Sequence, residues 1–554
     1  MFKPSLFCAA SVLALHAPAA LAQAPASLAQ RIDAAIAPYY QAGEPGAAVI
    51  VTKGGKTVFR KAYGLANLER RTPMNADMVQ RIGSVTKQFT AAAILMLAEE
   101  GKLDLSDDIG KHLPGYPAGA QKITIEHLLT HTSGIPSYTR KHDFQDKQHL
   151  DASVDEMIAT FKDEPLDFVP GTRWAYNNSG YYLLGAIIEK VSGKSYADFI
   201  HERILRPLGM KHTAYEGKDG RVAQASGYSP VKGKLAPSAP LSPSKVYAAG
   251  ALVSTVDDLA RWDAAIASGK LLKPASWKRV FTPYTLADGS STNYGYGWET
   301  GKLQGLPMVA HGGNTNGFST YTMRVPDEKL YVAVLSNAEY GVVQPDVVAS
   351  KAAAIAIDKP LPEFRAIEMD AKALEAFMGT YQAGPNKEPR TIAVVDGKLV
   401  MQRPGRPRIA LLPHADNAFF IDKSLTHLEF ARDAQGKVTQ MTVHQDGLAH
   451  VMPRVGDLPA ERKAVTLPGE LLDTYVGSYQ MAPGFVLEVK RDGEQLVGQA
   501  TGQPPLNLMA LGEGQFFVKQ IESASVRFEK GADGKIEKIM WKQGGKERPA
   551  ARIK

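Results

Sequence analysis

The sequence predicts an α/β domain followed by two small all-β antiparallel barrels. Strand-like runs stand at both ends of residues 23–360 with helical segments between them, which indicates one α/β unit. Beyond Pro360 the chain changes to short β-like runs that are separated by glycine turns. An internal repeat divides this second part into residues 361–458 and 459–554. A chain of 554 residues is too long for one compact core, so several domains are expected.

The elements of the α/β unit follow from local patterns. A helix is expected near Leu28–Tyr40, and a β-hairpin runs from Gly46 to Tyr63 around the turn at residues 53–56. The segment Thr86–Glu100 contains strong helix formers and is apolar nearly all round, which predicts a buried helix. Residues 321–335 return to strand character on both sides of a turn that begins at Pro326.

The repeat joins two stretches of β-like sequence by one offset of 98 residues. Residues 377–381 (Phe-Met-Gly-Thr-Tyr) recur as residues 475–479 (Tyr-Val-Gly-Ser-Tyr), and Phe430 recurs as Phe528. A shared offset across separate matches is hard to obtain by chance, so we infer two tandem domains, each long enough for a closed barrel. Four aromatic residues are expected to fill the barrel interiors: Phe419, Phe420, Phe516 and Phe517. We expect the barrels to pack on the α/β unit and to narrow the entrance to its site.

Residues 1–22 have the pattern of a signal peptide. Lys3 stands before the mostly apolar run of residues 6–15, and Ala20-Leu21-Ala22 supplies the small-x-small pattern at which signal peptidase cleaves. The apolar run is too short to predict a membrane span, and no later segment is long and apolar enough to span a bilayer. The only cysteine, Cys8, lies in this leader, so cleavage removes thiol catalysis and disulfides from consideration. We expect a periplasmic or secreted protein.

The charge distribution offers no support for nucleic-acid binding. Lys and Arg total 64 against 57 Asp and Glu, and the net charge of +7 is spread along the chain. The sequence contains no basic stripe interleaved with aromatic residues and no zinc-finger spacing. We therefore expect small-molecule or peptide partners and no nucleic-acid partner.

Ser84 and Lys87 form the first candidate for nucleophilic chemistry. They lie three residues apart at a predicted strand-to-helix junction, which places their Cβ atoms about 5–6 Å apart on one helical face. A serine hydroxyl is a weak nucleophile and needs a base, and a lysine that burial keeps neutral can serve. The start of a helix also supplies N–H groups and a positive dipole end for an oxyanion.

The same Ser-x-x-Lys spacing occurs a second time, at Ser242 and Lys245. This copy lies in a proline-rich stretch where we expect no helix to align the two side chains. The non-catalytic interpretation of an isolated match is a serine that caps a helix N-terminus and a lysine on the surface. The motif alone is therefore a weak signal. Whether Ser84 and Lys87 are catalytic has to be judged from the other motifs in the sequence.

Two further motifs accompany Ser84-x-x-Lys87: Tyr176-Asn177-Asn178, and His311-Gly-Gly-Asn314 within residues 311–318. In order and rough spacing the three resemble the active-site elements of class C β-lactamases, low-molecular-weight penicillin-binding proteins, D-aminopeptidases and related esterases. Residues 127–134 and 249–255 resemble the same superfamily, and the resemblance covers about residues 30–340. It implies a β-lactamase-like domain with an antiparallel sheet flanked by helices. The two barrels resemble the three-domain layout of D-aminopeptidases and the general shape of lipocalins.

The resemblance also implies a role for each motif residue. Ser84 would attack a carbonyl to form an acyl-enzyme, and Lys87 and Tyr176 would move the proton; which of them is the base stays open. Tyr176 would need a nearby cation to favour its phenolate, and Lys87 would provide it. Asn178 would orient a substrate amide. The N–H groups of Ser84 and Asn314 would form the oxyanion hole, with Gly313 leaving room for the substrate.

His311 stands where β-lactamases carry lysine. A neutral imidazole holds a substrate carboxylate less firmly than an ammonium does, so the sequence favours a D-aminopeptidase or DD-peptidase over efficient β-lactam hydrolysis. Small peptides, amides or esters, including peptidoglycan fragments, are the expected substrates. The alternatives are a promiscuous esterase, a weak β-lactamase, or a non-catalytic wall- or ligand-binding protein.

This chemistry requires no metal and no organic cofactor. His127 and His131 lie four residues apart and resemble the pair in zinc peptidases. No glutamate stands between them to act as the base, and the sequence shows no third ligand. A zinc peptidase is therefore disfavoured.

Overall fold

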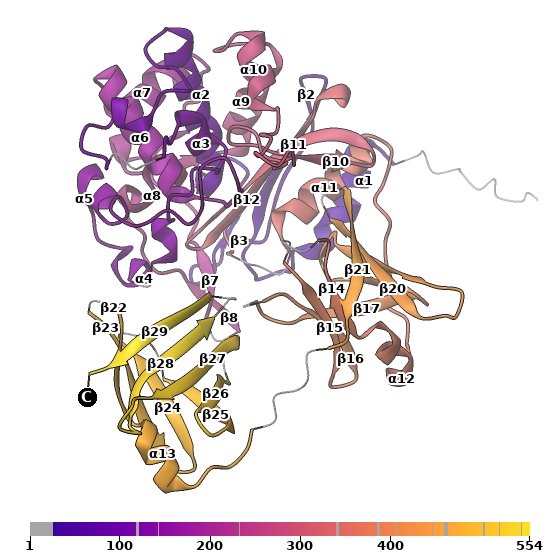
Figure 1. Ribbon diagram of the computed structural model, residues 1–554. Helices are drawn as coiled ribbons and strands as arrows, with labels where there is room; N and C mark the ends of the chain where they lie inside the picture. The colour runs from indigo at the N-terminus through magenta and orange to yellow at the C-terminus, as the bar shows by residue number, and fades with distance from the viewer. Residues whose placement is uncertain are drawn as a thin grey trace, which may run out of the picture.

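The computed structural model divides into a large α/β domain and two barrels (Figure 1). It describes residues 26–553 except for gaps at 118–120, 142, 232, 340–342, 385–387, 405, 446, 459–463, 483, 502, 504, 520 and 544–545. The predicted signal peptide and Cys8 lie outside the described residues. Within the described chain, every helix is too short or too polar to cross a bilayer.

The α/β domain is organised around one antiparallel six-stranded sheet with the order β10-β11-β12-β13-β1-β2. These strands are β1 Ala47–Lys53, β2 Lys56–Tyr63, β10 Glu299–Leu303, β11 Leu306–Thr315, β12 Phe318–Val325 and β13 Leu330–Ser336. Both predicted hairpins are confirmed. The N-terminal hairpin joins strands from the far end of the domain, because β1 pairs with β13 in a register that places Val49 opposite Val334.

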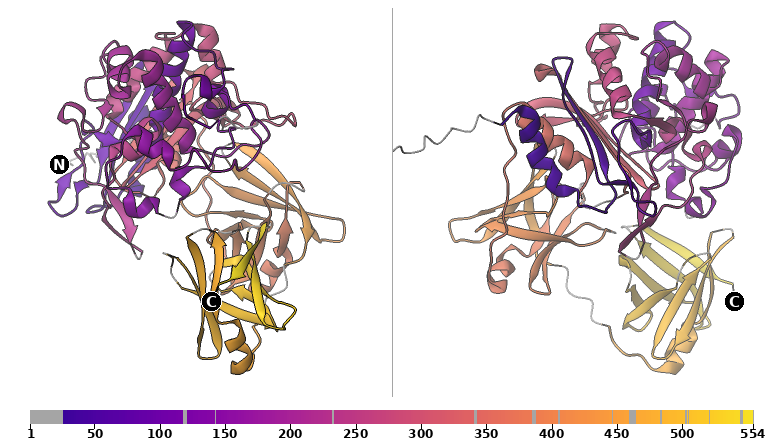
Figure 2. Two further views of the ribbon diagram at one scale, coloured as in Figure 1. Left: turned by 60° about the vertical axis from the view of Figure 1, so that its left-hand side comes forward. Right: turned by 180° about the vertical axis from the view of Figure 1, so that it is seen from behind.

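The central strand β1 is buried on both faces, which explains its uninterrupted apolar sequence. Val49 and Val51 face a core formed with α1 (Leu28–Ile36) and α11 (Pro345–Ala356). Ala48 and Ile50 face the larger core on the opposite side. Figure 2 shows α1 and α11 on one side of the sheet and the main group of helices on the other.

The main group of helices contains the predicted buried helix, α2 (Thr86–Glu99). Twelve of its fourteen residues are buried, so its nearly all-round apolar sequence reflects a central position in the larger core. The other helices here are α3 Ile125–Leu129, α4 Phe144–Lys147, α5 Val154–Ala159, α6 Asn178–Ser192, α7 Tyr196–Ile200, α8 Pro243–Gly250, α9 Val256–Ala267 and α10 Pro274–Val280. The short strands are β3 Leu65–Asn67, β4 Thr72–Pro73, β5 Gln80–Arg81, β6 Ala214–Tyr215, β7 Tyr228–Val231, β8 Lys234–Pro237 and β9 Leu252–Ser254.

The Ser-x-x-Lys match at Ser242 corrects one expectation. We expected no helix after Ser242, but α8 begins there, because Pro243 fits the first position of a helix, where no N–H is needed. Ser242 is the N-cap, and its hydroxyl accepts a hydrogen bond from the Ser244 N–H. Lys245 Nζ lies 3.6 Å from the Met157 sulfur instead of near Ser242. This pair is therefore a capping serine with an unrelated lysine.

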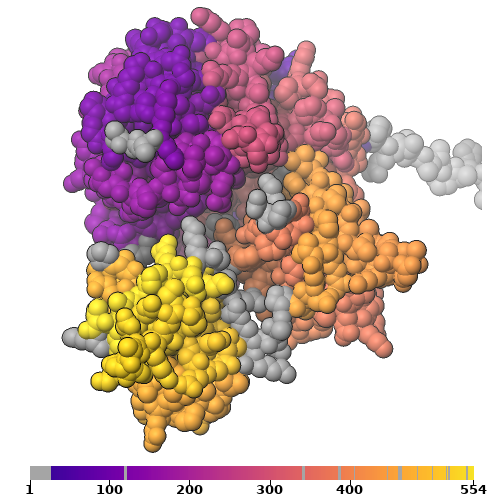
Figure 3. Space-filling view, in the orientation of Figure 1, coloured from indigo at the N-terminus to yellow at the C-terminus, as the bar shows by residue number. Residues whose placement is uncertain are grey.

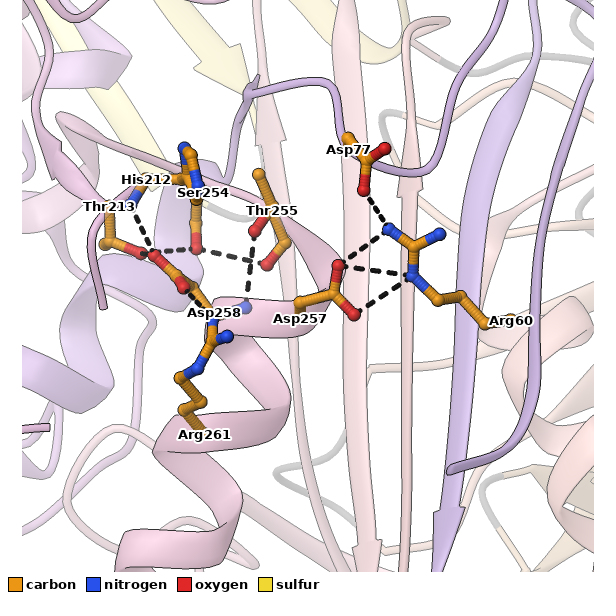
Figure 4. Close-up of polar contacts among 9 residues, drawn as sticks. All are labelled: Arg60, Asp77, His212, Thr213, Ser254, Thr255, Asp257, Asp258 and Arg261. Atoms are coloured by element: carbon orange, nitrogen blue, oxygen red, sulfur yellow. Dashed lines mark hydrogen bonds and ion pairs between the residues drawn. The ribbon is translucent and has the colours of Figure 1, made fainter. Parts of the chain in front are cut away.

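A buried carboxylate fixes the strand that leads to Ser84 (Figure 4). Asp258, in the first turn of α9, accepts hydrogen bonds from the His212 N–H at 2.8 Å and the Thr213 hydroxyl at 2.9 Å. The Thr213 hydroxyl also contacts the Ser254 hydroxyl, at the end of β9. Strand β9 pairs with β5, which ends three residues before Ser84. The same figure shows Arg60 joining Asp77 and Asp257 at a more exposed position.

The C-terminal part consists of two closed eight-stranded antiparallel barrels, as predicted. The first contains β14 Gly379–Tyr381, β15 Arg390–Val395, β16 Lys398–Gln402, β17 Ile409–Ala415, β18 Ala418–Phe420, β19 His427–Arg432, β20 Val438–Gln445 and β21 Leu448–Gly456, preceded by α12 Ala371–Leu374. The second contains β22 Gly477–Ala482, β23 Phe485–Asp492, β24 Gln495–Ala500, β25 Leu506–Gly512, β26 Gln515–Val518, β27 Ile521–Lys530, β28 Ile536–Gln543 and β29 Lys546–Arg552, preceded by α13 Gly469–Tyr475.

The repeat extends to matched hydrogen bonds in the two barrels. The Tyr381 hydroxyl donates to the Phe377 carbonyl at 2.7 Å, and the Tyr479 hydroxyl donates to the Tyr475 carbonyl at 2.8 Å.

Figure 3 shows the first barrel, in orange, below the sheet end of the α/β domain and the second, in yellow, below its helical end.

The expectation for the barrel aromatics is half correct. Phe419 and Phe516 are buried in the interiors, whereas Phe420 and Phe517 are only half-buried. Successive side chains of a strand point to opposite faces, so adjacent phenylalanines cannot both face the interior.

The Asp258 network makes a prediction about stability. Replacing Asp258 with alanine leaves the His212 and Thr213 donors without their acceptor, so Asp258→Ala should lower the free energy of unfolding by about 3 kcal/mol. Urea unfolding followed by tryptophan fluorescence measures this, because Trp262 is buried on the same helix. The control Asp77→Ala removes a carboxylate whose side chain is 72% exposed and should cost less than about 1 kcal/mol. Equal effects of the two variants would contradict this account.

Candidate active site

Ser84 lies between strand β5 and helix α2, in the short 3-10 helix Gly83–Val85. This is the predicted strand-to-helix junction. Ser84 is half-buried, and Lys87, in the first turn of α2, is fully buried. The Lys87 Nζ lies 3.0 Å from the Ser84 Oγ. The structure therefore brings the predicted nucleophile and its lysine partner into direct contact.

Lys87 Nζ contacts three oxygens, and none of them belongs to a charged group. Besides Ser84, they are the Asn178 Oδ1 at 2.9 Å and the Ala249 carbonyl at 2.8 Å. Burial lowers the pKa of Lys87 well below its ordinary value of 10.5, because a charged amine loses its hydration there. This direction favours a neutral amine at neutral pH.

The three contacts fit the neutral amine. A carbonyl oxygen and an amide oxygen can only accept hydrogen bonds, so the Ala249 and Asn178 oxygens each take one N–H of Lys87. A neutral amine then has a lone pair left, and the remaining neighbour is the Ser84 hydroxyl, which can donate. The arrangement suits the transfer of the Ser84 proton to Lys87.

Tyr176 lies immediately before helix α6, whose N-cap is Asn177. The Asn177 side chain accepts a hydrogen bond from the Gly180 N–H at 2.8 Å and so holds the start of the helix. The Tyr176 ring centre lies 4.9 Å from Lys87 Nζ. Its buried hydroxyl makes no hydrogen bond of good geometry to the described residues.

The electrostatics of Tyr176 differ from the expectation. Burial raises its pKa above the ordinary value of 10.0, and the interaction of its hydroxyl with Ser84 opposes this only in part. We expected Lys87 to favour the phenolate. That expectation is wrong because burial also disfavours the charge on Lys87 that would have stabilised it. The structure favours a neutral phenol.

Asn178, the first residue of α6, uses both ends of its side-chain amide within the protein. Its Oδ1 accepts from Lys87, and its Nδ2 donates to the Thr139 hydroxyl at 3.2 Å. The Oδ1 end of the amide thus faces the lysine and the Nδ2 end faces Thr139. Asn178 thus orients Lys87, and its action on a substrate amide stays a prediction.

His311 lies on β11 and is buried with both ring nitrogens engaged. Nδ1 lies 2.6 Å from the Gly312 carbonyl, which can only accept, so this nitrogen carries the proton. Nε2 then accepts from the Tyr294 hydroxyl at 2.8 Å. Burial and the nearby Lys87 lower the pKa of His311 to about 3, so the imidazole is neutral at neutral pH.

Gly313 and Gly83 let strand β11 come close to the turn at residues 83–85 that carries Ser84, the nucleophile turn. A Cβ on Gly313 would lie 2.1 Å from the Ile82 carbonyl oxygen and 3.2 Å from the Ser84 nitrogen. A Cβ on Gly83, which has a φ of +50°, would lie 3.1 Å from the Asn314 nitrogen. The backbone groups of Ser84 and Asn314 therefore lie close together, as an oxyanion hole requires. The close approach of two chain segments is the direct reason for glycine at position 313.

Sequence reasoning missed several residues of this site. Tyr294 begins the alternating pattern Tyr-Gly-Tyr-Gly-Trp at residues 294–298, which was a usable signal. Ala249 lies in the stretch that resembles the superfamily, but its carbonyl could not be singled out, because every residue has a backbone oxygen. Thr139 carries no sequence signal, because an isolated threonine matches no motif.

The two histidines that resembled a zinc pair have structural contacts instead. The Nδ1 of His131 accepts from the Asn177 N–H at 3.1 Å, and its ring packs 4.4 Å from that of Tyr176. The Nδ1 of His127 accepts from the Thr124 N–H at the start of α3. No third metal ligand joins them among the residues that the structure describes.

Comparisons with known proteins agree with the fold. The sequence profile of the Beta-lactamase family matches residues 28–356, and a domain of unknown function (DUF3471) matches residues 364–454 and 461–551. Penicillin-binding protein 4* of Bacillus subtilis (strain 168) is 29% identical over 427 residues, which cover 72% of this chain and 92% of that protein.

Two solved structures add to this similarity. The octameric penicillin-binding protein homologue from Pyrococcus abyssi matches with a TM-score of 0.54 at 29% identity, over 74% of this chain and 96% of that one. D-amino acid amidase from Ochrobactrum anthropi SV3 matches with a TM-score of 0.50 at 25% identity, over 60% of this chain and 97% of that one.

The close approach at Gly313 predicts a selective loss of activity. Gly313→Ala places a methyl group against the Ile82 carbonyl and pushes β11 away from Ser84, so kcat/KM should fall by at least about 100-fold. Gly312→Ala is the matched control on the same strand, because its Cβ would lie 3.6 Å from the Tyr321 ring, an ordinary contact. Hydrolysis of a chromogenic ester by both variants measures the effect. Full activity of Gly313→Ala would contradict the geometry.

Proposed function

The chain belongs to the Beta-lactamase family, and from this premise we propose that it is an exported serine hydrolase that forms an acyl-enzyme at Ser84. Its substrates are peptide amides or esters, with D-amino-acid residues preferred, as in D-aminopeptidases and DD-peptidases. The observation that carries the proposal is the contact of Ser84 with a buried lysine whose other partners are all neutral acceptors.

Acylation begins with the Ser84 hydroxyl. Lys87, as a neutral amine, takes its proton while Oγ forms a bond to the substrate carbonyl carbon. The negative charge that develops on the carbonyl oxygen is held by the N–H groups of Ser84 and Asn314. The tetrahedral intermediate then expels the amine or alcohol, which leaves with a proton passed from Lys87 through the Tyr176 hydroxyl.

Deacylation reverses these roles with water as the nucleophile. The neutral Lys87 that acylation regenerates removes a proton from water, which attacks the ester formed at Ser84. Collapse of the second intermediate returns the proton to the Ser84 oxygen and releases the acid. Every proton removed in one half of the cycle is returned in the same half.

The preference for D-configured amides rests on similarity and on His311. Similar proteins include a D-amino acid amidase and a penicillin-binding protein homologue. A neutral His311 that is already engaged by Tyr294 offers no cation for a substrate carboxylate, which disfavours efficient β-lactam hydrolysis. A panel of D-alanyl amides, peptides ending in D-Ala-D-Ala, short acyl esters and a chromogenic cephalosporin separates the alternatives.

Export rests on the predicted signal peptide at residues 1–22.

Covalent labelling tests the nucleophile. Intact-protein mass spectrometry after incubation with a fluorophosphonate should show one adduct on the wild type and none on Ser84→Ala. Ser242→Ala is the matched control, since it removes the serine of another Ser-x-x-Lys match, and it should be labelled like the wild type. A penicillin adduct in parallel would support the D-peptide-processing branch. Labelling that survives in Ser84→Ala would refute the assignment, and no labelling of the wild type by either reagent would favour a binding function for the fold.

The pH dependence of this labelling tests the base. Lys87 acts only when neutral, so the rate should fall as the pH falls through its pKa, which burial places well below 10.5. The fluorophosphonate has no ionisable group in this range. His311 has its pKa near 3 and Tyr176 has its pKa raised, so a single limb that lies well below the ordinary lysine pKa belongs to Lys87. A limb centred near 10.5 would show that Lys87 is charged at neutral pH.

A further inference from the structure

A second group of chemically capable side chains lies on the first barrel, away from Ser84. His427 and Glu429 on β19 and His444 on β20 place one ligand atom each within 4.8 Å of the others. Residues 428 and 430 of β19 are buried in the barrel interior, and side chains alternate along a strand. The three side chains of the group therefore lie on the outer face of the barrel. His427 and His444 are directly paired across the two strands.

One distance within the group fits a tetrahedral metal shell. The His444 Nε2 lies 3.4 Å from the Glu429 Oε2. Two ligands that bind zinc at 2.0–2.2 Å in a tetrahedron lie about 3.4 Å apart. The rings of His427 and His444 stack at 4.4 Å with an angle of 3° between their planes, so the two imidazoles lie face to face.

One nitrogen of the group lacks a partner that a purely structural role would supply. The buried Nε2 of His444 makes no hydrogen bond to the residues that the structure describes. A buried polar atom without a partner is costly, and a metal ion would satisfy it. The ring of Phe364 packs 5.0 Å from the His427 ring and shields that side of the pair from water.

Two members of the group, His427 and His444, line a groove between the barrel and the α/β domain. This groove has a volume of about 550 Å³, and the barrel contributes His427 and His444 while the α/β domain contributes Lys302 and Met308. The two domains touch at its edge, since a Cβ on Gly447 would lie only 1.8 Å from the Lys302 carbonyl oxygen. Three protein ligands at this place would leave one coordination position facing the groove.

The second barrel provides an internal comparison. The positions 98 residues further along are Ser525, Arg527 and Lys542, and Ser525 pairs with Lys542 as His427 pairs with His444. The barrel fold therefore forms without the His-Glu-His group. Its presence in the first barrel alone, beside the α/β domain, points to a specific role.

We propose that His427, Glu429 and His444 bind one Zn²⁺ ion at the interface of the first barrel and the α/β domain, with a fourth position open to water or to a donor in the groove. Two imidazoles and a carboxylate are a ligand set that zinc accepts. The ion ties β19 to β20 beside the domain contact. This site is independent of Ser84 and of the proposed hydrolase activity.

Titration of the metal-free protein tests the site. The full chain, without a polyhistidine tag, is treated with a chelator, dialysed, and titrated with ZnCl₂ by calorimetry, with the stoichiometry checked by native mass spectrometry. We expect one zinc ion per chain and a melting temperature that rises with zinc. His427→Ser and Glu429→Gln should each weaken zinc binding by about 100-fold or more, since each removes a direct ligand.

Controls separate ligand loss from misfolding. His427→Ser introduces the residue that the second barrel carries, so its melting temperature without zinc should equal that of the metal-free wild type. His450→Ser removes an exposed histidine of the same barrel and should bind zinc normally. The proposal is overturned if the wild type binds no stoichiometric zinc, or if His427→Ser and Glu429→Gln bind it as the wild type does.

Discussion

The contact between Lys87 and Ser84 is the constraint on which the rest of the α/β domain depends. An ammonium group buried without a carboxylate partner loses its hydration and gains little in return. The protein surrounds the Lys87 nitrogen with a hydroxyl, an amide oxygen and a backbone carbonyl, all of them neutral. These groups satisfy the hydrogen bonds of an amine, and they do not compensate a full charge. Burial thus favours the neutral amine that the proposed role of Lys87 as a base requires.

Several elements hold this contact in place, and each is costly in a different way. Helix α8 is broken at Tyr247, which adopts a φ of +40° that a non-glycine residue rarely takes. After this break, the Ala248 carbonyl accepts from Thr90 and the Ala249 carbonyl accepts from Lys87. Backbone strain in α8 therefore accompanies the placement of an acceptor at the lysine. On the other side, two glycines bring β11 against the nucleophile turn.

The parts that sequence reasoning predicted are those set by local patterns. The hairpins and helix α2 follow from runs of apolar residues, and the barrels follow from the offset that aligns Phe377–Tyr381 with Tyr475–Tyr479. Helix α8 was missed because its proline-rich start resembles a loop, although Pro243 is acceptable at the first position of a helix. The contact of the Ala249 carbonyl with Lys87 and the groove beside His427 form only when segments that are distant in the sequence meet. Local sequence patterns therefore cannot predict them.

The central claim is that Lys87 is neutral before the reaction, and neutron diffraction tests it most directly. Crystals of the protein exchanged into D₂O at about pH 8 would show the deuterons on Lys87 Nζ, well below the ordinary lysine pKa. The account predicts two deuterons, directed at Ala249 and Asn178, with the Ser84 deuteron directed at the lysine nitrogen. Three deuterons on Nζ would mean that the amine is charged, and Lys87 could then not be the base that activates Ser84.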